Sequence, residues 1–449
     1  MADTHTHLPA DTNQALGIAR YAIEFMAAGS PDQAVLDKTR RFNTDATLCG
    51  LSALALGTNA PTILRNEALQ YAVPAGDHGP GLGNSKHHGA TVFGSSTRVK
   101  SEKAILANCA AVREWDSNGT NFGYDPSRGN TAGEFGHNDF YAVSLAAAQM
   151  LGADGSAALK GMVLHDEIRG RLAEVFSLKT YKIDHVLHGG IASAATFGAM
   201  VGATAEQIES AIGMVVAHAV PFRAIRAGKQ LSDSKGSSAA ITTEFAITAV
   251  KRSMAGFLGP RDIFRNPEAV FRIFEGPGQM FKAVSADSAN TAPADASPFD
   301  LHLGMSGGDF AVMGMHFKLG LYEHQSAGAI QAVIDLIAAA PTLLDDPSGK
   351  SIAGIRVIAY EPAFGIIGDP AKRNPTTRQS ADHSMVYILA TLLRKALDRR
   401  AAGDGFAWND LMLEPADYSA AAINDPRTRA IMETIEFAHG GDEYDSKYP

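Results

Sequence analysis

The sequence predicts a mainly α-helical protein with two domains, a large all-helical domain and a smaller α+β lid domain. Its 449 residues exceed the size of one typical domain. From residue 13 to about 260, Ala-rich amphipathic stretches alternate with short Gly, Asp and Pro breaks. Between about 260 and 310 the composition shifts to Gly, Pro and aromatic residues. We therefore place the all-helical domain at 1–266 and 404–449, and the α+β lid at 267–403.

Individual segments support this division. Residues 204–219 predict a helix, because Thr204 and Gln207 have capping-box spacing and an apolar stripe follows them. Residues 139–151 and 190–202 also predict helices, which are apolar on nearly all sides and therefore buried. In the lid, 352–360 alternates like a β-strand, while 325–340 and 383–402 predict helices. The segment 415–438 predicts helix again, and we expect it to pack on the first domain.

Composition narrows the class of protein. The formal net charge is −9, from 39 basic and 48 acidic residues, which argues against nucleic acid or an anionic membrane as a partner. The two cysteines, Cys49 and Cys109, are too few for a disulfide framework, a multi-cysteine zinc site or an iron–sulfur cluster. No signal peptide precedes residue 13, and no window has the roughly 20 apolar residues of a membrane span. These features predict a cytoplasmic protein.

Two polar segments lie between predicted helices. The long segment 114–141 contains Asp116, Thr120 and His137; it is either functional or a surface Ω-loop. His137 and Asp139 make half of a metal site, but no second ligand pair accompanies them, so we predict no metal. In KIDHVLHGG (182–190), His185 and His188 share a helix face, as a ligand pair or as packed or capping side chains. Asp184 is suited to orienting one imidazole.

Three further segments concentrate cationic side chains. The segment 223–235 contains Arg223, Arg226, Lys229 and Lys235, which form either an anion pocket or a solvated helix end. Lys318 and His324 precede the predicted helix at 325–340. In 372–387, Arg373, Arg378, Asp382 and His383 precede the next helix, where Asp382 or Ser384 is also suited to capping that helix.

Taken together, these segments resemble the MmgE/PrpD family, which includes dehydratases and decarboxylases of citrate-type acids. REWDSNGT (113–120) and GEFGHNDFY (133–141) resemble its first block, and KIDHVLHGGIASAAT (182–196) resembles the dehydratase form of the second. HFKLGLYEHQSAGAIQA (316–332) and RQSADHSMVYILA (378–390) are similar to the third and fourth blocks. The order of these pieces makes the resemblance specific. It implies an all-helical domain with an α+β lid, and a homodimer.

The resemblance also implies an active site and a reaction. The family's active-site positions fall on Asp116, Thr120, His137, His185, Lys235, Lys318 and His324. We expect His137 and His185 to share the acid–base work, Asp116 to orient one of them, and His324 to close over the substrate. Lys235 and Lys318 would hold carboxylates and stabilise developing charge. We assign Thr120 and Lys318 to substrate binding, and we add Arg226 and Arg373 as substrate-binding residues.

The predicted activity is a cofactor-independent hydro-lyase that converts 2-methylcitrate to 2-methyl-aconitate, as in propionate catabolism. The alternatives are cis-aconitate decarboxylation, epimerisation or isomerisation of a polycarboxylate at the same site, or a non-catalytic carboxylate-binding protein. Two departures from the family pattern bear on the choice. Gly119 replaces the family's second aspartate in the first block, and 365–377 lacks the tyrosine of the decarboxylase members.

Overall fold

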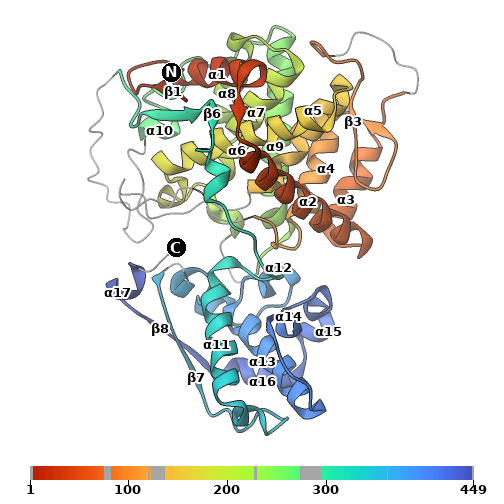
Figure 1. Ribbon diagram of the computed structural model, residues 1–449, viewed down its shortest axis with the longest axis vertical. Helices are drawn as coiled ribbons and strands as arrows, with labels where there is room; N and C mark the ends of the chain where they lie inside the picture. Colours follow the sequence, from red (N-terminus) through yellow and green to blue (C-terminus); the bar gives the residue numbers. More distant parts are fainter. Residues whose placement is uncertain are drawn as a thin grey trace. The chain divides into compact units, whose positions relative to one another are not determined.

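The computed structural model describes residues 4–74, 82–119, 122, 137–226, 230–273, 295–361 and 363–446, and it divides into two compact units. Unit 1 comprises Met1–Glu114, Asn118–Arg223 and Gly236–Phe317. Unit 2 comprises Lys318–Pro449 together with two short pieces from the N-terminal part of the chain, Trp115–Ser117 and Ala224–Lys235. The fold is mainly α-helical, as the sequence predicts (Figure 1).

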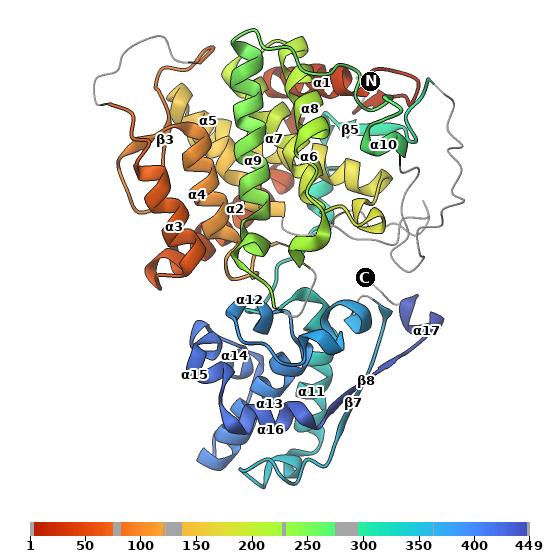
Figure 2. The same ribbon diagram turned by 180° about the vertical axis from the view of Figure 1, so that it is seen from behind.

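Unit 1 is a helical body. Its helices are α1 (Gln14–Ala28), α2 (Gln33–Ala55), α3 (Asn59–Leu69), α4 (Ser101–Arg113), α5 (Ala142–Leu151), α6 (Gly155–Val175), α7 (Val186–Val201), α8 (Ala205–His218), α9 (Asp233–Met254) and α10 (Val270–Ile273). The first residues of α9 are grouped with unit 2, and α9 belongs to unit 1 from Gly236 onward. Figures 1 and 2 show α6, α7 and α8 lying alongside one another. The helix predicted at 204–219 is α8, and both hydrogen bonds of its Thr204–Gln207 capping box are present.

Small residues allow helix α7 to lie at the centre of this body. All of its residues except Ala199 are buried, which agrees with the prediction of a buried helix there. Gly189 shows why: a Cβ at this position would lie 2.1 Å from Cζ of Phe140. Any larger side chain at residue 189 would push the Phe140 ring out of the core.

The predicted lid boundary at 267 is wrong, because the described residues 267–273 and 295–317 belong to unit 1 rather than unit 2. Strand β5 (Leu301–Gly304) pairs antiparallel with β1 (His5–Leu8). Strand β6 (Ser306–Gly307) pairs in parallel with β2 (Ser30–Pro31). Among the described residues, this unit also pairs β3 (Ala90–Thr91) with β4 (Arg98–Val99). The change in composition near 260 marks a return to the N-terminal strands, not the start of a domain.

Unit 2 has its own hydrophobic core around the buried helix α13 (Met385–Ala402). Its other helices are α11 (Ala327–Ala339), α12 (Arg378–Ala381), α14 (Trp408–Leu411), α15 (Ala420–Ile423), α16 (Pro426–Glu433) and α17 (Asp442–Asp445). The helices predicted at 325–340 and 383–402, and the strand predicted at 352–360, correspond to α11, α13 and β7 (Ile355–Ala359). Unit 2 is therefore the α+β part of the chain.

The placement of 404–449 in the all-helical domain is also wrong, since the structure groups these residues with unit 2. Strand β8 (Ile435–His439) pairs in parallel with β7, and α16 packs on α13. Leu411, Ile431 and Ile435 are buried in the unit 2 core. The 415–438 segment is thus short helices followed by a strand, and its partners lie in the same unit.

Among the described residues, no single helix is both long and apolar enough to cross a membrane. Helices α2 and α3 meet the length and composition criteria only as a pair, which is bent by 91° between them.

Candidate active site

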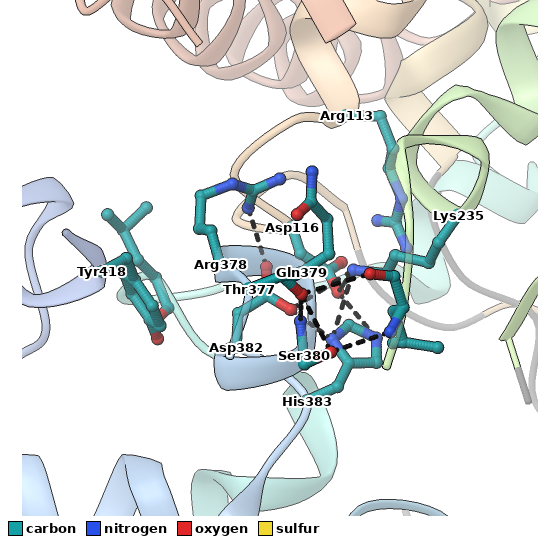
Figure 3. Close-up of polar contacts among 12 residues, drawn as sticks. Arg113, Asp116, Lys235, Thr377, Arg378, Gln379, Ser380, Asp382, His383 and Tyr418 are labelled. Carbon is teal, nitrogen blue, oxygen red and sulfur yellow. Dashed lines mark hydrogen bonds and ion pairs between the residues drawn. The ribbon is translucent and has the colours of Figure 1, made fainter. Parts of the chain in front are cut away.

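A buried group of charged side chains lies within unit 2 (Figure 3). We call it the lysine–carboxylate cluster, and its members are Asp116, Lys235, Lys318, Arg378, Asp382 and His383. Each of them except Arg378 is at most 9% exposed. Three are residues that the resemblance placed in the active site: Asp116, Lys235 and Lys318. The structure brings these three into direct contact, although they are 202 positions apart at the extremes.

Asp116 joins two lysines. Its Oδ2 atom accepts from Nζ of Lys235 at 3.0 Å, and its Oδ1 atom accepts from Nζ of Lys318 at 3.0 Å. Lys318 also donates to the backbone carbonyl of Asp116 at 2.6 Å. The residue adopts φ = +50°, a left-handed conformation that aspartate tolerates better than most residues. In this conformation Lys318 contacts both the carboxylate and the carbonyl of Asp116.

The other carboxylate of the cluster is Asp382. Its Oδ2 atom accepts from Nη1 of Arg378 at 2.8 Å, and its Oδ1 atom lies 3.5 Å from Nζ of Lys235. Burial alone would raise the pKa of the Asp382 carboxyl. The nearby Lys235, His383 and Arg378 outweigh burial and bring this pKa below its ordinary value of 3.8. Asp382 is therefore ionised at neutral pH.

His383 links the two carboxylates. Its Nδ1 atom lies 2.6 Å from Oδ1 of Asp382, and its Nε2 atom lies 3.1 Å from Oδ2 of Asp116. Nδ1 is also 3.2 Å from Nζ of Lys235. Burial, followed by the ammonium charge of Lys235, lowers the pKa of His383 below 6.5. The imidazole is thus held between two carboxylates and a lysine.

Hydrogen bonds to residues 377–380 hold the first turn of α9, which carries Lys235, next to Asp382 and His383. Leu231 donates from its backbone to the Ser380 hydroxyl at 2.8 Å, and Thr377 donates to the Leu231 carbonyl at 3.1 Å. Gln379 donates to Asp233 at 2.7 Å. These bonds tie the segment that carries Lys235 to helix α12, which is followed directly by Asp382 and His383. Ser384 caps α13, as predicted, by accepting from the backbone of Tyr387.

The remaining predicted site residues lie elsewhere or outside the described part. Thr120 and the side chain of His137 are outside the described residues. His324 is half-buried in a turn before α11, and Arg226 is half-buried in the turn Arg223–Arg226. Arg373 donates to the carbonyl of Met432 at 3.1 Å, which gives it a structural role at the end of α16.

His185 is buried in unit 1, at the N-cap of α7, with its Nδ1 atom 3.5 Å from Oδ1 of Asp184. The two groups are within ion-pair distance, and the role of Asp184 in orienting this imidazole stays a prediction. His188 is fully buried one turn later, and burial lowers its pKa to about 3. The sequence left this pair open as metal ligands or as packed side chains, and His188 fits the second alternative, a neutral histidine packed in the core.

The 114–141 segment contains buried polar contacts at both ends. Asn118 donates to Oδ1 of Asn138 at 2.8 Å and also to Asp139. Nε of Arg113 lies 3.7 Å from Asp139, so this aspartate has ion-pair and hydrogen-bond partners in unit 1. The described ends of the segment are therefore buried rather than exposed as a surface loop.

Sequence reasoning named Asp382 and His383 but left them out of the predicted site. An adjacent aspartate and histidine before a helix could have indicated a functional site, but an aspartate at that position is equally typical of a helix cap. The cluster contains a further arrangement that was not predicted. Asp116, Asp382 and His383 each offer one metal-ligating atom, and these atoms lie within 4.8 Å of one another.

Comparison with known proteins agrees with the resemblance. The MmgE/PrpD N-terminal domain model matches residues 17–281, and the MmgE/PrpD C-terminal domain model matches residues 323–449. The chain is similar to a 2-methylcitrate dehydratase of Escherichia coli O157:H7, with 24% identity over 399 residues, which cover 83% of this chain and 76% of that protein. The two matched regions together span most of the sequence, and the chain belongs to the MmgE/PrpD family.

Proposed function

We propose that this protein is a hydro-lyase that removes water from a citrate-type tricarboxylate, with 2-methylcitrate as the substrate and 2-methyl-aconitate as the product. Family membership and the dehydratase named among its relatives support the reaction class. The proposal rests on one observation: the buried ammonium groups of Lys235 and Lys318 each donate a hydrogen bond to a different carboxylate oxygen of Asp116.

The chemistry explains why such a pair of lysines is useful. Dehydration removes a weakly acidic proton beside a carboxylate, so negative charge builds up on that carboxylate in the transition state. Fixed cations in a buried site stabilise such charge strongly, because little water screens them and little reorganisation is needed. Lys235 and Lys318 are held in place by Asp116 before any substrate arrives. We assign them to binding and stabilising substrate carboxylates.

The proton transfers require a base and an acid, for which imidazoles are suited because their pKa lies near neutral pH. We keep His137, His185 and His324 as the candidates, since they match the family positions. His383 is a less suitable general base, because both of its ring nitrogens contact carboxylates. We assign it to holding the cluster together.

The test is a proton NMR assay with 2-methylcitrate, citrate and cis-aconitate, run with and without a chelator. Dehydration of 2-methylcitrate supports the proposal. Release of CO₂ from cis-aconitate would instead show a decarboxylase, and deuterium exchange without loss of water would show an epimerase or isomerase. Loss of turnover in chelator would contradict the cofactor-independent scheme.

His185 provides the first specific prediction. His185→Asn should reduce kcat by about 10²–10⁴-fold, the range that a general acid or base contributes. His439→Asn is a matched control, because His439 lies on β8 and contacts Glu361 and Asp445 rather than the cluster. Activity near that of the wild type in His185→Asn, with the fold intact by circular dichroism, would remove His185 from the mechanism.

A further inference from the structure

The triangle formed by Asp116, Asp382 and His383 has the donor set of a metal site. Two carboxylate oxygens and one imidazole nitrogen lie within 4.8 Å of one another, and all three residues are buried. Such mixed N/O donors bind Zn²⁺ and Co²⁺, and three protein ligands are typical of a site that keeps one position open.

The ammonium of Lys235 contacts all three corners of this triangle. Its Nζ atom lies 3.0 Å from Oδ2 of Asp116, 3.5 Å from Oδ1 of Asp382 and 3.2 Å from Nδ1 of His383. Ligands around a tetrahedral Zn²⁺ are about 3.3 Å apart, since each bond is about 2.0–2.1 Å long. Nδ1 of His383 lies 2.6 Å from Oδ1 of Asp382, and its Nε2 lies 3.1 Å from Oδ2 of Asp116, so these donors are already close enough together to share one small cation.

The outer oxygens of both carboxylates are held by other cations. Lys318 contacts Oδ1 of Asp116, and Arg378 contacts Oδ2 of Asp382. Each carboxylate therefore turns its second oxygen toward Lys235. Hydrogen bonds of this kind orient the ligands of metal sites, and here they act whether the central cation is an ammonium or an ion.

We propose that the Asp116–Asp382–His383 triangle is a cation site whose resident cation is the side chain of Lys235, and that removing this ammonium turns it into a binding site for a divalent transition-metal ion. The inference goes beyond the proposed reaction, because it concerns only the charge and geometry of the cluster. It is tested by metal binding in the absence of substrate, so its failure and the failure of the proposed function are distinguishable.

The experiment uses the full chain carrying Lys235→Ala, purified in chelator and titrated with Co²⁺. Binding is followed by the visible absorption of the bound ion and by calorimetry. We expect one Co²⁺ per chain, bound at least 100-fold more tightly than by the wild type. The midpoint of thermal unfolding should rise with Co²⁺ in the variant and stay unchanged in the wild type.

Two control variants make the result specific. Lys103 also lies between two carboxylates, at 2.5 Å from Glu67 and 2.7 Å from Glu244, but these contacts include no imidazole. Lys103→Ala should therefore bind Co²⁺ no better than the wild type. The double variant Lys235→Ala with His383→Ala should lose the gained affinity. Equal binding by Lys103→Ala, or undiminished binding by the double variant, would overturn the proposal.

The alanine variant leaves two buried carboxylates without their shared ammonium, so its folding is monitored by circular dichroism. If it unfolds in chelator, recovery of the native spectrum on adding Co²⁺ supports the proposal. Failure to recover with Co²⁺ contradicts it. A folded variant with no Co²⁺ affinity beyond that of the wild type contradicts it equally.

Discussion

Asp116 combines several constraints in one residue. Its carboxylate contacts two ammonium groups and an imidazole, and its backbone adopts a positive φ. Residues in such conformations persist only where their surroundings fix them, and they are frequent at functional sites. At Asp116 the fixing contact is visible, because Lys318 binds both its carboxylate and its carbonyl.

Asp116→Asn tests this residue directly. Asparagine keeps the size and tolerates the left-handed backbone, but its amide group would face an ammonium and the shared negative charge would be lost. We expect the free energy of unfolding to fall by about 3–5 kcal/mol, as when one partner of a buried ion pair is removed. Urea denaturation measures this loss. Asp37→Asn, at an exposed pair with Arg40, should leave the urea midpoint close to that of the wild type.

The residue scale also shows why part of the site was predictable. Asp116, Lys235 and Lys318 were found through the family resemblance, which gives positions without geometry. Asp382 was open to interpretation as a helix cap, because a local pattern cannot reveal a partner 147 positions away. Its role depends on Lys235, and that contact exists only in the folded chain.

Among the elements, the packed helices α6 and α7 hold a buried histidine in its neutral form. His165 of α6 lies 3.0 Å from the Ser193 hydroxyl of α7 and is fully buried. Burial, assisted by the nearby Arg169 charge, lowers the pKa of His165 to about 3. Burial in the same helix raises the pKa of Asp166 to about 8, so both groups favour their neutral forms.

These helices should make stability depend on pH. Between pH 6.5 and 3 the unfolded chain binds a proton at His165 that the folded chain excludes, so the stability contributed by His165 is full above pH 6.5 and is lost as the pH decreases. The raised pKa of Asp166 acts in the opposite direction over this range, so the contribution of His165 is obtained as the difference between the wild type and a variant that lacks it. From pH 6.5 to 5 the loss is about 2 kcal/mol for this residue. Denaturation of the wild type and of His165→Gln at both pH values checks this. A parallel decrease in the two proteins would show that His165 is not responsible.

Helix α8 makes a close contact that a single methyl group should disrupt. A Cβ at Gly213 would lie 1.8 Å from the carbonyl oxygen of Pro260. Because that oxygen belongs to the backbone, Gly213→Ala should cost about 1–3 kcal/mol or more of stability. Gly155→Ala, where no atom lies within 4 Å, should be neutral or slightly stabilising. Thermal unfolding of both variants tests the contrast, and equal midpoints would contradict it.

At the scale of elements, helices were predictable and strand partners were not. The α8 capping box and the alternation of β7 are local signals, and both predictions are confirmed. The pairing of β7 with β8 joins residues 80 positions apart, and neither segment carries a signal that identifies its partner. The wrong domain boundaries follow from this, since pairings of β5 and β8 decide which unit each segment joins.

For the whole molecule, each unit has its own hydrophobic core, and the two described clusters share no residue. Leu389, on α13, is fully buried in the unit 2 core. Leu389→Ala should destabilise this core by about 2–5 kcal/mol. Hydrogen exchange should accelerate in α13, α11 and α16 while protection in α6 and α7 of unit 1 is maintained. Equal acceleration in both units would show that they unfold as one.

The pairing of β1 with β5 has a consequence for how the chain is made. His5 pairs with Gly304, so the first strand leaves the ribosome about 300 residues before its partner. At about 5–20 residues per second, this strand stays single for about 15–60 s during synthesis. The β1–β5 pair therefore forms only late in synthesis, and until then the backbone N–H and C=O groups of β1 have no strand to pair with.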